Sequence, residues 1–175
     1  LAQQGFIAPT KLDADRLAQV NLDRQRTNRD GMVVLNVWAA ASLISGSTGW
    51  LASDDAEWRA FHQANFVWNL VNAGLGINGI VQSYGDVSHL SLAQSREASQ
   101  SMQVSYLINA GLDVLYVSLG AILLWRGNVD HSPLLRGWGK SVMLQAVFLV
   151  LFDLAMFAVH SVVGSPLRAG TGSAF

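Results

Sequence analysis

Four long stretches of the chain are apolar and almost free of charge. Two of them contain no Asp, Glu, Lys or Arg, and the other two contain a single acid each, Asp113 and Asp153. A helix that crosses a bilayer needs about 20 mostly apolar residues, whereas a soluble surface helix carries charge on its outer face. The sequence therefore predicts four membrane-spanning helices, at about 31–51, 60–83, 104–125 and 139–162.

Helix-start signals agree with these spans. Pro9-Thr10 with Asp13 resembles a capped helix start and predicts a helix from about 11 towards 29, which is expected to be amphipathic. Further N-caps are predicted at Asp54 (with Glu57), Ser91 (with Gln94) and Ser132 (before Pro133). The predicted organisation is an N-terminal segment at 1–29, a transmembrane domain at 30–163 and a C-terminal tail at 164–175. The predicted fold class is all-α, a polytopic membrane protein with an antiparallel four-helix bundle and an N-terminal amphipathic helix.

Composition supports a membrane setting and excludes several function classes. The 175 residues suffice for one domain, and only 13% of them are charged, about half the usual fraction. The net charge of -1 gives no general attraction for nucleic acid. With no Cys, the chain has no disulfide and no thiolate metal site. Short loops leave little room for soluble machinery, so the chain is predicted to be non-enzymatic.

The four spans assign the loops to two sides of the membrane. Face A holds the N-terminus, the 84–103 loop and the C-terminus, and face B holds the loops near 52–59 and 126–138. Four of the six Trp fall at face B, as in an aromatic belt: Trp50, Trp58, Trp125 and Trp138. Seven of the eleven Lys and Arg fall at face A, which favours face A as cytoplasmic, in a bacterial inner membrane. A cleaved signal peptide ahead of Leu1 would instead place the N-terminus outside.

Polar residues recur inside the spans at helical spacing. The second span carries a stripe of His62, Asn65, Asn69 and Asn72, and the remaining intramembrane polar cluster is Asp113, Asp153, Asn109, Asn36 and His160. Because lipid offers no hydrogen-bond partners, these stripes should point into the bundle. From a rise of ~1.5 Å per residue, Asp113, Asp153 and Asn72 should lie at similar depth, about 12–16 Å from face A. His62 should lie near face B and His160 near face A, so no shared metal or haem site is expected.

The two acids, Asp113 and Asp153, leave three roles open. Two carboxylates at one depth in a low-dielectric bundle cannot both ionise cheaply, so they should hold a proton, a cation or a protonated His. A proton or cation relay has this requirement. A hydrogen-bond network that only fixes helix packing, and a contact with a partner subunit or bound cofactor, are the alternatives.

The first half of the chain carries a distinctive set of short motifs. They are Gly31-Met32-Val33-Val34-Leu35, Trp38-Ala39, Gly49-Trp50, Phe61-His62-Gln63-Ala64-Asn65, Trp68-Asn69 and Val71-Asn72-Ala73-Gly74. This stretch resembles an uncharacterised family of small four-helix membrane proteins from Bacteroidota-type bacteria. The resemblance implies an envelope membrane and draws interest to the second-span stripe, but implies no activity.

Three functions are therefore open. The first is a non-enzymatic membrane subunit or accessory protein, bound to other membrane chains or to itself as a homo-oligomer within the lipid bilayer. The second is a small proton- or cation-coupled transporter or channel that uses Asp113 and Asp153. The third is a binder of a hydrophobic cofactor, a quinone, pigment or haem, contacted by His62 or His160. No cofactor, metal or nucleic-acid partner is assigned.

Overall fold

The computed structural model describes residues 13–169, and almost all of them are helical. Four long helices and one short helix follow one another: α1 (Ala14–Ala52), α2 (Ala56–Gln82), α3 (Leu92–Val129), α4 (Pro133–Val163) and α5 (Ser165–Ala169). No strand occurs within this range. The predicted all-helical class is therefore confirmed. Pro9-Thr10 and the last residues of the predicted tail lie outside the described residues, and α5 occupies the start of that tail.

Side-chain caps begin each long helix. Asp13 caps α1 by accepting a hydrogen bond from the Arg16 amide at 2.8 Å. Ser91 forms a capping box with Gln94 at the start of α3, and Ser132 caps α4 ahead of Pro133.

The cap of α2 is one residue later than the sequence suggested. Asp55, not Asp54, accepts hydrogen bonds from the amides of Glu57 and Trp58, each at 2.9 Å. The reason is geometric. A capping side chain reaches the second and third amides of a helix only from the residue directly before its first turn, which here begins at Ala56.

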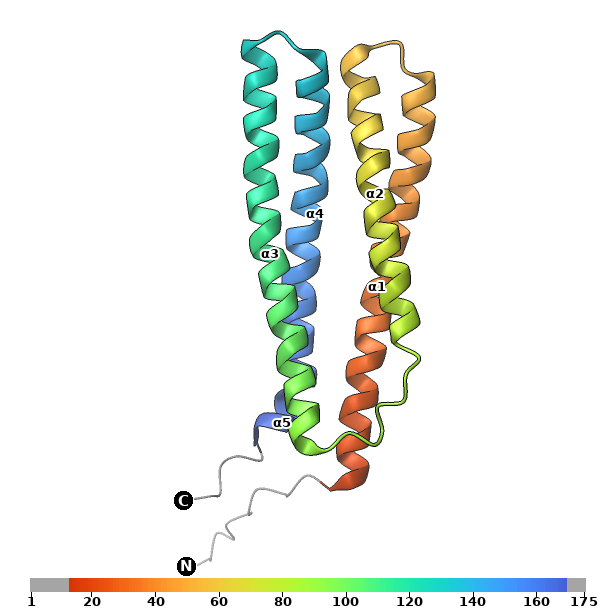
Figure 1. The fold of residues 1–175 in the computed structure, drawn as a ribbon, viewed down its shortest axis with the longest axis vertical. Coiled ribbons are helices and arrows are strands. Elements are labelled where there is room, and N and C mark those ends of the chain that lie inside the picture. Colours follow the sequence, from red (N-terminus) through yellow and green to blue (C-terminus); the bar gives the residue numbers. More distant parts are fainter. Residues whose placement is uncertain (1–12, 170–175) are drawn as a thin grey trace, which may run out of the picture.

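The helices form two antiparallel hairpins, α1–α2 and α3–α4 (Figure 1). α4 packs against α3, α2 and α1, whereas α3 packs mainly against α4. Both ends of the described chain and the α2–α3 connection lie at the face A end, and the two tight turns lie at the face B end (Figure 1). Because α3 makes few contacts with the first hairpin, one flank of the bundle, between α2 and α3, is not closed by the chain's own helices.

Three helices are long and apolar enough to cross a membrane: α1, α3 and α4. They indicate a membrane protein. α2 has 27 residues but is not among the three. Its amide side chains at Asn65, Asn69 and Asn72 lower its mean hydropathy.

The distribution of side chains is the reverse of that in a soluble protein. Asn69 and Gln145 are fully buried, whereas Val37 is 65% exposed and Leu51 is 88% exposed. Large exposed apolar side chains occur on all four long helices. A polar interior under an apolar surface is the arrangement that a lipid environment permits, because lipid solvates apolar side chains and leaves polar groups to pair with one another.

α1 is one continuous helix of 39 residues, about 58 Å long. This length exceeds the ~30 Å of a bilayer's hydrocarbon core. Residues 14–29 therefore extend the first predicted span along the same axis, and they pack on the start of α3. There the Asn21 amide donates to the Ser95 hydroxyl at 2.8 Å, and the buried Arg24 donates to the Ser95 carbonyl oxygen at 3.1 Å. Burial lowers the pKa of Arg24 from its usual value.

Candidate functional site

A seven-residue spacing builds the seam between α3 and α4. On α3 the buried residues Ser99, Tyr106, Asp113, Gly120 and Gly127 are each seven apart, and on α4 the same spacing relates Gly139, Ala146, Asp153 and His160. Such a repeat keeps one face of each helix against its neighbour. The rungs pair antiparallel: Gly120 lies against Gly139, and the rings of Tyr106 and His160 stack with centroids 5.4 Å apart.

Asp113 and Asp153 form one rung of this seam. Each is only 5% exposed, and their carboxyl groups are close enough to interact. The Oδ2 atom of Asp113 is buried and has no hydrogen-bond partner among the described residues. Within the same part of the chain, neither carboxyl makes an ion pair with Lys, Arg or His. Two facing carboxylates without a positive partner repel each other, so the pair requires a proton or a bound cation.

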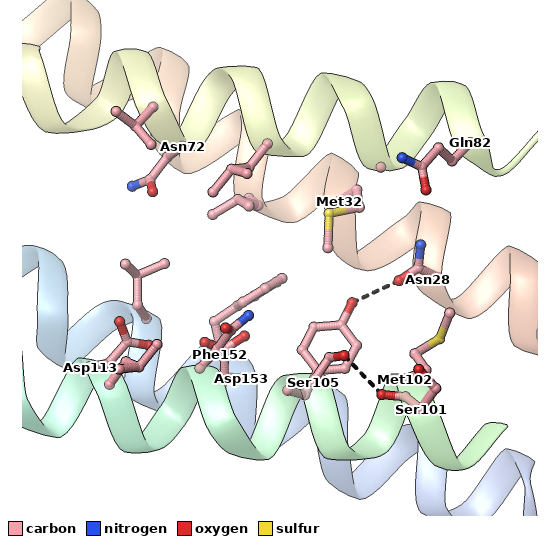
Figure 2. Close-up of a pocket in the computed structure, with 18 of the residues that line it drawn as sticks. Asn28, Met32, Asn72, Gln82, Ser101, Met102, Ser105, Asp113, Phe152 and Asp153 are labelled. Carbon is pink, nitrogen blue, oxygen red and sulfur yellow. Dashed lines mark hydrogen bonds between the residues drawn. The ribbon is translucent and has the colours of Figure 1, made fainter. Parts of the chain in front are cut away.

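The pair opens into a cavity of about 690 Å³ between the two hairpins (Figure 2). All four long helices contribute to its wall, and none of the described residues that line it is Lys, Arg or His. Asn72 of α2 lies across the cavity from Asp113, and Phe152 lies beside Asp153 (Figure 2). A volume of this size is within the range of small-molecule sites. We call it the polar cavity.

Polar groups continue from the carboxyl pair towards face A. Ser101, Ser105, Asn109 and Asp113, spaced four apart on α3, all line the polar cavity. Asn28 and Gln82 line it from the first hairpin, and the Tyr106 hydroxyl donates a hydrogen bond to Asn28 Oδ1 at 2.8 Å (Figure 2). Side chains that can donate or accept hydrogen bonds therefore line the cavity from the carboxyl pair towards face A.

A second, apolar cavity of about 730 Å³ adjoins the first on the side of face B. The two share Trp68, Val71 and Tyr116 as wall residues. The rings of Trp68 and Tyr116 meet edge to face between α2 and α3, with centroids 5.0 Å apart. We call the two adjoining cavities together the groove; it lies along the flank between α2 and α3, is polar at mid-depth and apolar towards face B, and has the Trp68–Tyr116 contact at the border between its two parts.

An amide ladder runs along the other side of α2, inside the bundle. Asn72 donates to the side chain of Asn69 at 3.2 Å, and Asn69 donates to the Asn65 carbonyl oxygen at 2.8 Å. Gln145 of α4 donates to the Asn65 side chain and accepts from the Trp38 indole at 2.8 Å. The ladder joins α1, α2 and α4 and leaves Asn72 as its end at the polar cavity.

A family model of unknown function, DUF6992, matches residues 34–154. The chain belongs to this family. The match contains α2, α3, both carboxyl residues and the amide ladder, while Asn28 and His160 lie outside it. Comparisons with curated proteins and with solved structures give no match.

In this DUF6992 protein, four of the six residues of the predicted intramembrane cluster meet at one cavity: Asp113, Asp153, Asn72 and Asn109. Asn109 lines the mouth and is exposed there, not buried in the bundle. Asn36 lies apart, donating to the Met32 carbonyl oxygen at 2.8 Å beside Gly76. His160 is 1% exposed behind Tyr106 and does not line the cavity, and neither of its ring nitrogens has a hydrogen-bond partner among residues 13–169.

The second-span stripe of this DUF6992 chain separates into two parts. Asn65 and Asn69 are buried in the amide ladder. His62 lies at the face B end, with its ring against Gly49 and Trp58. Trp68, Tyr116 and the serines on α3 were not predicted as site residues. Ser101 and Ser105 could have been predicted, because they precede Asn109 and Asp113 at four-residue intervals on the same face of the helix.

Proposed function

We propose that all four long helices of this DUF6992 protein cross the membrane, with α2 as the fourth span. α2 lies alongside α1 in the bundle, and its length of about 40 Å is sufficient to cross. Its amides at Asn69 and Asn72 are buried, whereas Leu70 and Val71 beside them are 53% and 62% exposed. Mean hydropathy averages these two faces, but the bilayer meets only the apolar one.

The absence of cysteine from the sequence makes the span count directly testable. Single cysteines at Asp54, Ser88 and His131 would mark the three connections between the long helices. With four spans, a membrane-impermeant maleimide added to one side of intact cells should label D54C and H131C together, and S88C only from the other side. Labelling of S88C together with D54C would show that α2 does not cross.

We further propose that the Asp113–Asp153 pair takes up and releases a proton, as the coupling site of a small proton- or cation-coupled transporter. The observation that carries this proposal is the meeting of two buried carboxyl groups in a cavity whose wall holds no basic residue. Polar side chains line the cavity from the pair towards face A, and mostly apolar ones line the groove towards face B. Such asymmetry suits a site that opens to one side at a time.

Proton flux in reconstituted vesicles tests the coupling site. Wild-type protein in vesicles with a pH gradient and a trapped pH-sensitive dye should dissipate the gradient faster than empty vesicles. Asp113→Asn and Asp153→Asn should each abolish this flux, because an amide cannot bind the proton. Asp54→Asn is the matched control, since Asp54 is exposed in the α1–α2 turn and should leave the flux unchanged. Wild-type flux in either pair variant, or no flux with the wild type, would contradict the proposal.

A membrane subunit or accessory protein is the second candidate. The flank between α2 and α3 supports it, because the chain's own helices leave it open and the apolar cavity lies along it. The partner would be another membrane chain or a second copy in a bacterial cytoplasmic membrane. Purification in mild detergent from native membranes should then recover a stoichiometric complex, and recovery of the monomer alone would count against this role.

A further inference from the structure

We propose that the groove binds a hydrophobic organic cation, whose charged group sits at Asp113 and Asp153 in place of their proton. This inference rests on the proton-binding role proposed above and names the substrate class of the same site. Four observations support it: the charge of the site, an unpartnered carboxyl oxygen, the aromatic wall and the adjoining apolar cavity.

The charge of the groove selects a cation. The only Asp or Glu side chains that line it, among the described residues, are Asp113 and Asp153. None of the described residues that line either cavity is Lys, Arg or His. The Oδ2 atom of Asp113 has no partner in the described chain, although the residue is 5% exposed and lies at the cavity wall. A bound cation would let both carboxyls ionise. The net charge of the site then stays the same, because the cation replaces the shared proton. Each cation bound should release up to one proton.

Aromatic side chains line the cavity that holds the carboxyl pair. Trp68 and Tyr116 border both cavities, and Phe152 lines the polar cavity beside Asp153. Faces of aromatic rings attract cations, most strongly where water is excluded, and this is the usual way in which proteins recognise ammonium-type groups. A metal ion would instead favour a dense set of oxygen ligands, and residues 13–169 contain no group of three His, Cys, Asp or Glu side chains that could hold one.

The apolar cavity sets the second property of the ligand. Its wall holds Val67, Leu119 and Leu123 and, near face B, Trp138. The two cavities, of about 690 Å³ and about 730 Å³, could hold the charged centre and a bulky apolar body together. Because the groove follows the open flank between α2 and α3, a lipophilic cation could reach it from the bilayer.

Tetraphenylphosphonium is the appropriate probe, because it is a bulky apolar cation with no proton of its own. Binding to purified wild-type protein in detergent, measured by calorimetry, should strengthen by up to tenfold for each unit of rising pH while one proton is displaced. A pH dye in weak buffer should record proton release on binding. Triphenylphosphine oxide, which is neutral and keeps three of the four phenyl rings on phosphorus, should bind at least tenfold more weakly and without pH dependence.

Variants locate the binding. Asp113→Asn and Asp153→Asn should lose the pH dependence and most of the affinity, and Trp68→Ala should weaken binding about tenfold while keeping the pH dependence. Asp54→Asn should match the wild type. Helicity and a single elution peak would establish that each variant is folded, and the wild-type comparison of the two probes does not depend on any variant.

The outcomes separate this inference from the proposed function. Equal binding of the neutral probe, binding independent of pH, or no binding of the cation would each overturn the cation site. If proton flux persists in vesicles while the cation does not bind, the inference fails and the proton-binding role stands. If proton flux is also absent, both fail.

Discussion

The amide ladder makes a quantitative prediction about how α2 is held in the bundle. Gln145 is fully buried, accepts a hydrogen bond from the Trp38 indole at 2.8 Å and donates one to the Asn65 side chain. Gln145→Leu keeps a similar volume but removes both bonds. The Trp38 N–H and the Asn65 side-chain oxygen are then left without partners inside the bundle.

The expected cost follows from these two orphaned groups. A buried polar group without a partner costs about 1–3 kcal/mol, but hydrogen bonds between membrane helices measure nearer ~0.6 kcal/mol each. Gln145→Leu should therefore lower the free energy of unfolding by about 1–4 kcal/mol. Asn65→Leu removes the same bond from the other side and also frees the Ser42 carbonyl oxygen, to which Asn65 donates at 3.1 Å. The double variant should show a coupling energy of about 0.6–1.7 kcal/mol.

Unfolding by sodium dodecyl sulfate in mixed micelles, followed by Trp fluorescence and helicity, measures these differences. Asn78→Leu is the matched control, because Asn78 is an exposed amide on the same helix and its replacement should be neutral or stabilising. If Gln145→Leu is as stable as the wild type and the coupling energy is zero, then α2 does not pack its amide face against α4. The proposed fourth span would lose its main support.

Two further predictions concern the contact between α2 and α4 near face B. Gly137→Val should cost about 1–3 kcal/mol of stability, because an added side chain would meet the backbone of α2 at Glu57. Gly74→Val is the control and should cost much less, because the space around Gly74 is open. Equal melting temperatures of the two variants would contradict this contact. Hydrogen bonds from Lys140 and Arg136 hold the pKa of Glu57 below its usual value, so the stability they add is present above pH ~4.3 and is lost as the pH falls through the lowered pKa. Glu57→Gln should lower the free energy of unfolding at pH 7 by about 1 kcal/mol. In thermal unfolding between pH 3 and 7, the variant should lose less stability on acidification than the wild type. If stability falls equally with pH in both proteins, the ion pairs of Glu57 are not the source of the acid destabilisation.

The sequence predicted the helices well because their ends and faces depend on local chemistry. Ser91 and Ser132 cap helices where predicted, since a capping side chain acts only within one turn. The pairing of helices was not predictable in the same way. No short stretch of sequence indicates that α3 packs mainly on α4 and leaves a groove beside α2. The seven-residue repeat from Ser99 to Gly127 did carry part of this information, since it marks the side of α3 that meets a partner.

The mean hydropathy of α2 does not mark it as a membrane span, whereas its packing supports the proposed fourth span. A window average counts Asn65, Asn69 and Asn72 against the helix, but their amides are satisfied inside the bundle. Their partners lie on α1, on α4 and within α2 itself. The sequence placed these amides on one stripe, but only the structure shows the side chain of Gln145 that completes the ladder.

The carboxyl pair is not needed to hold α3 against α4. Gly120 and Gly139 already let the two backbones approach closely, and Gly127 does the same against Arg136 near the turn. Close packing of small residues is the usual source of helix association in lipid, whereas a charge at mid-depth costs free energy unless it is neutralised. If Asp113 served only to pack the two helices together, an alanine or a glycine there would serve as well, and such a residue would remove the proposed proton site. We therefore propose that the two carboxyls are kept for proton binding in the cavity, although they cost the α3–α4 contact free energy. Asp113→Asn should accordingly leave the unfolding free energy within about 1 kcal/mol of the wild type while it abolishes proton flux, and a large loss of stability with intact flux would reverse this conclusion.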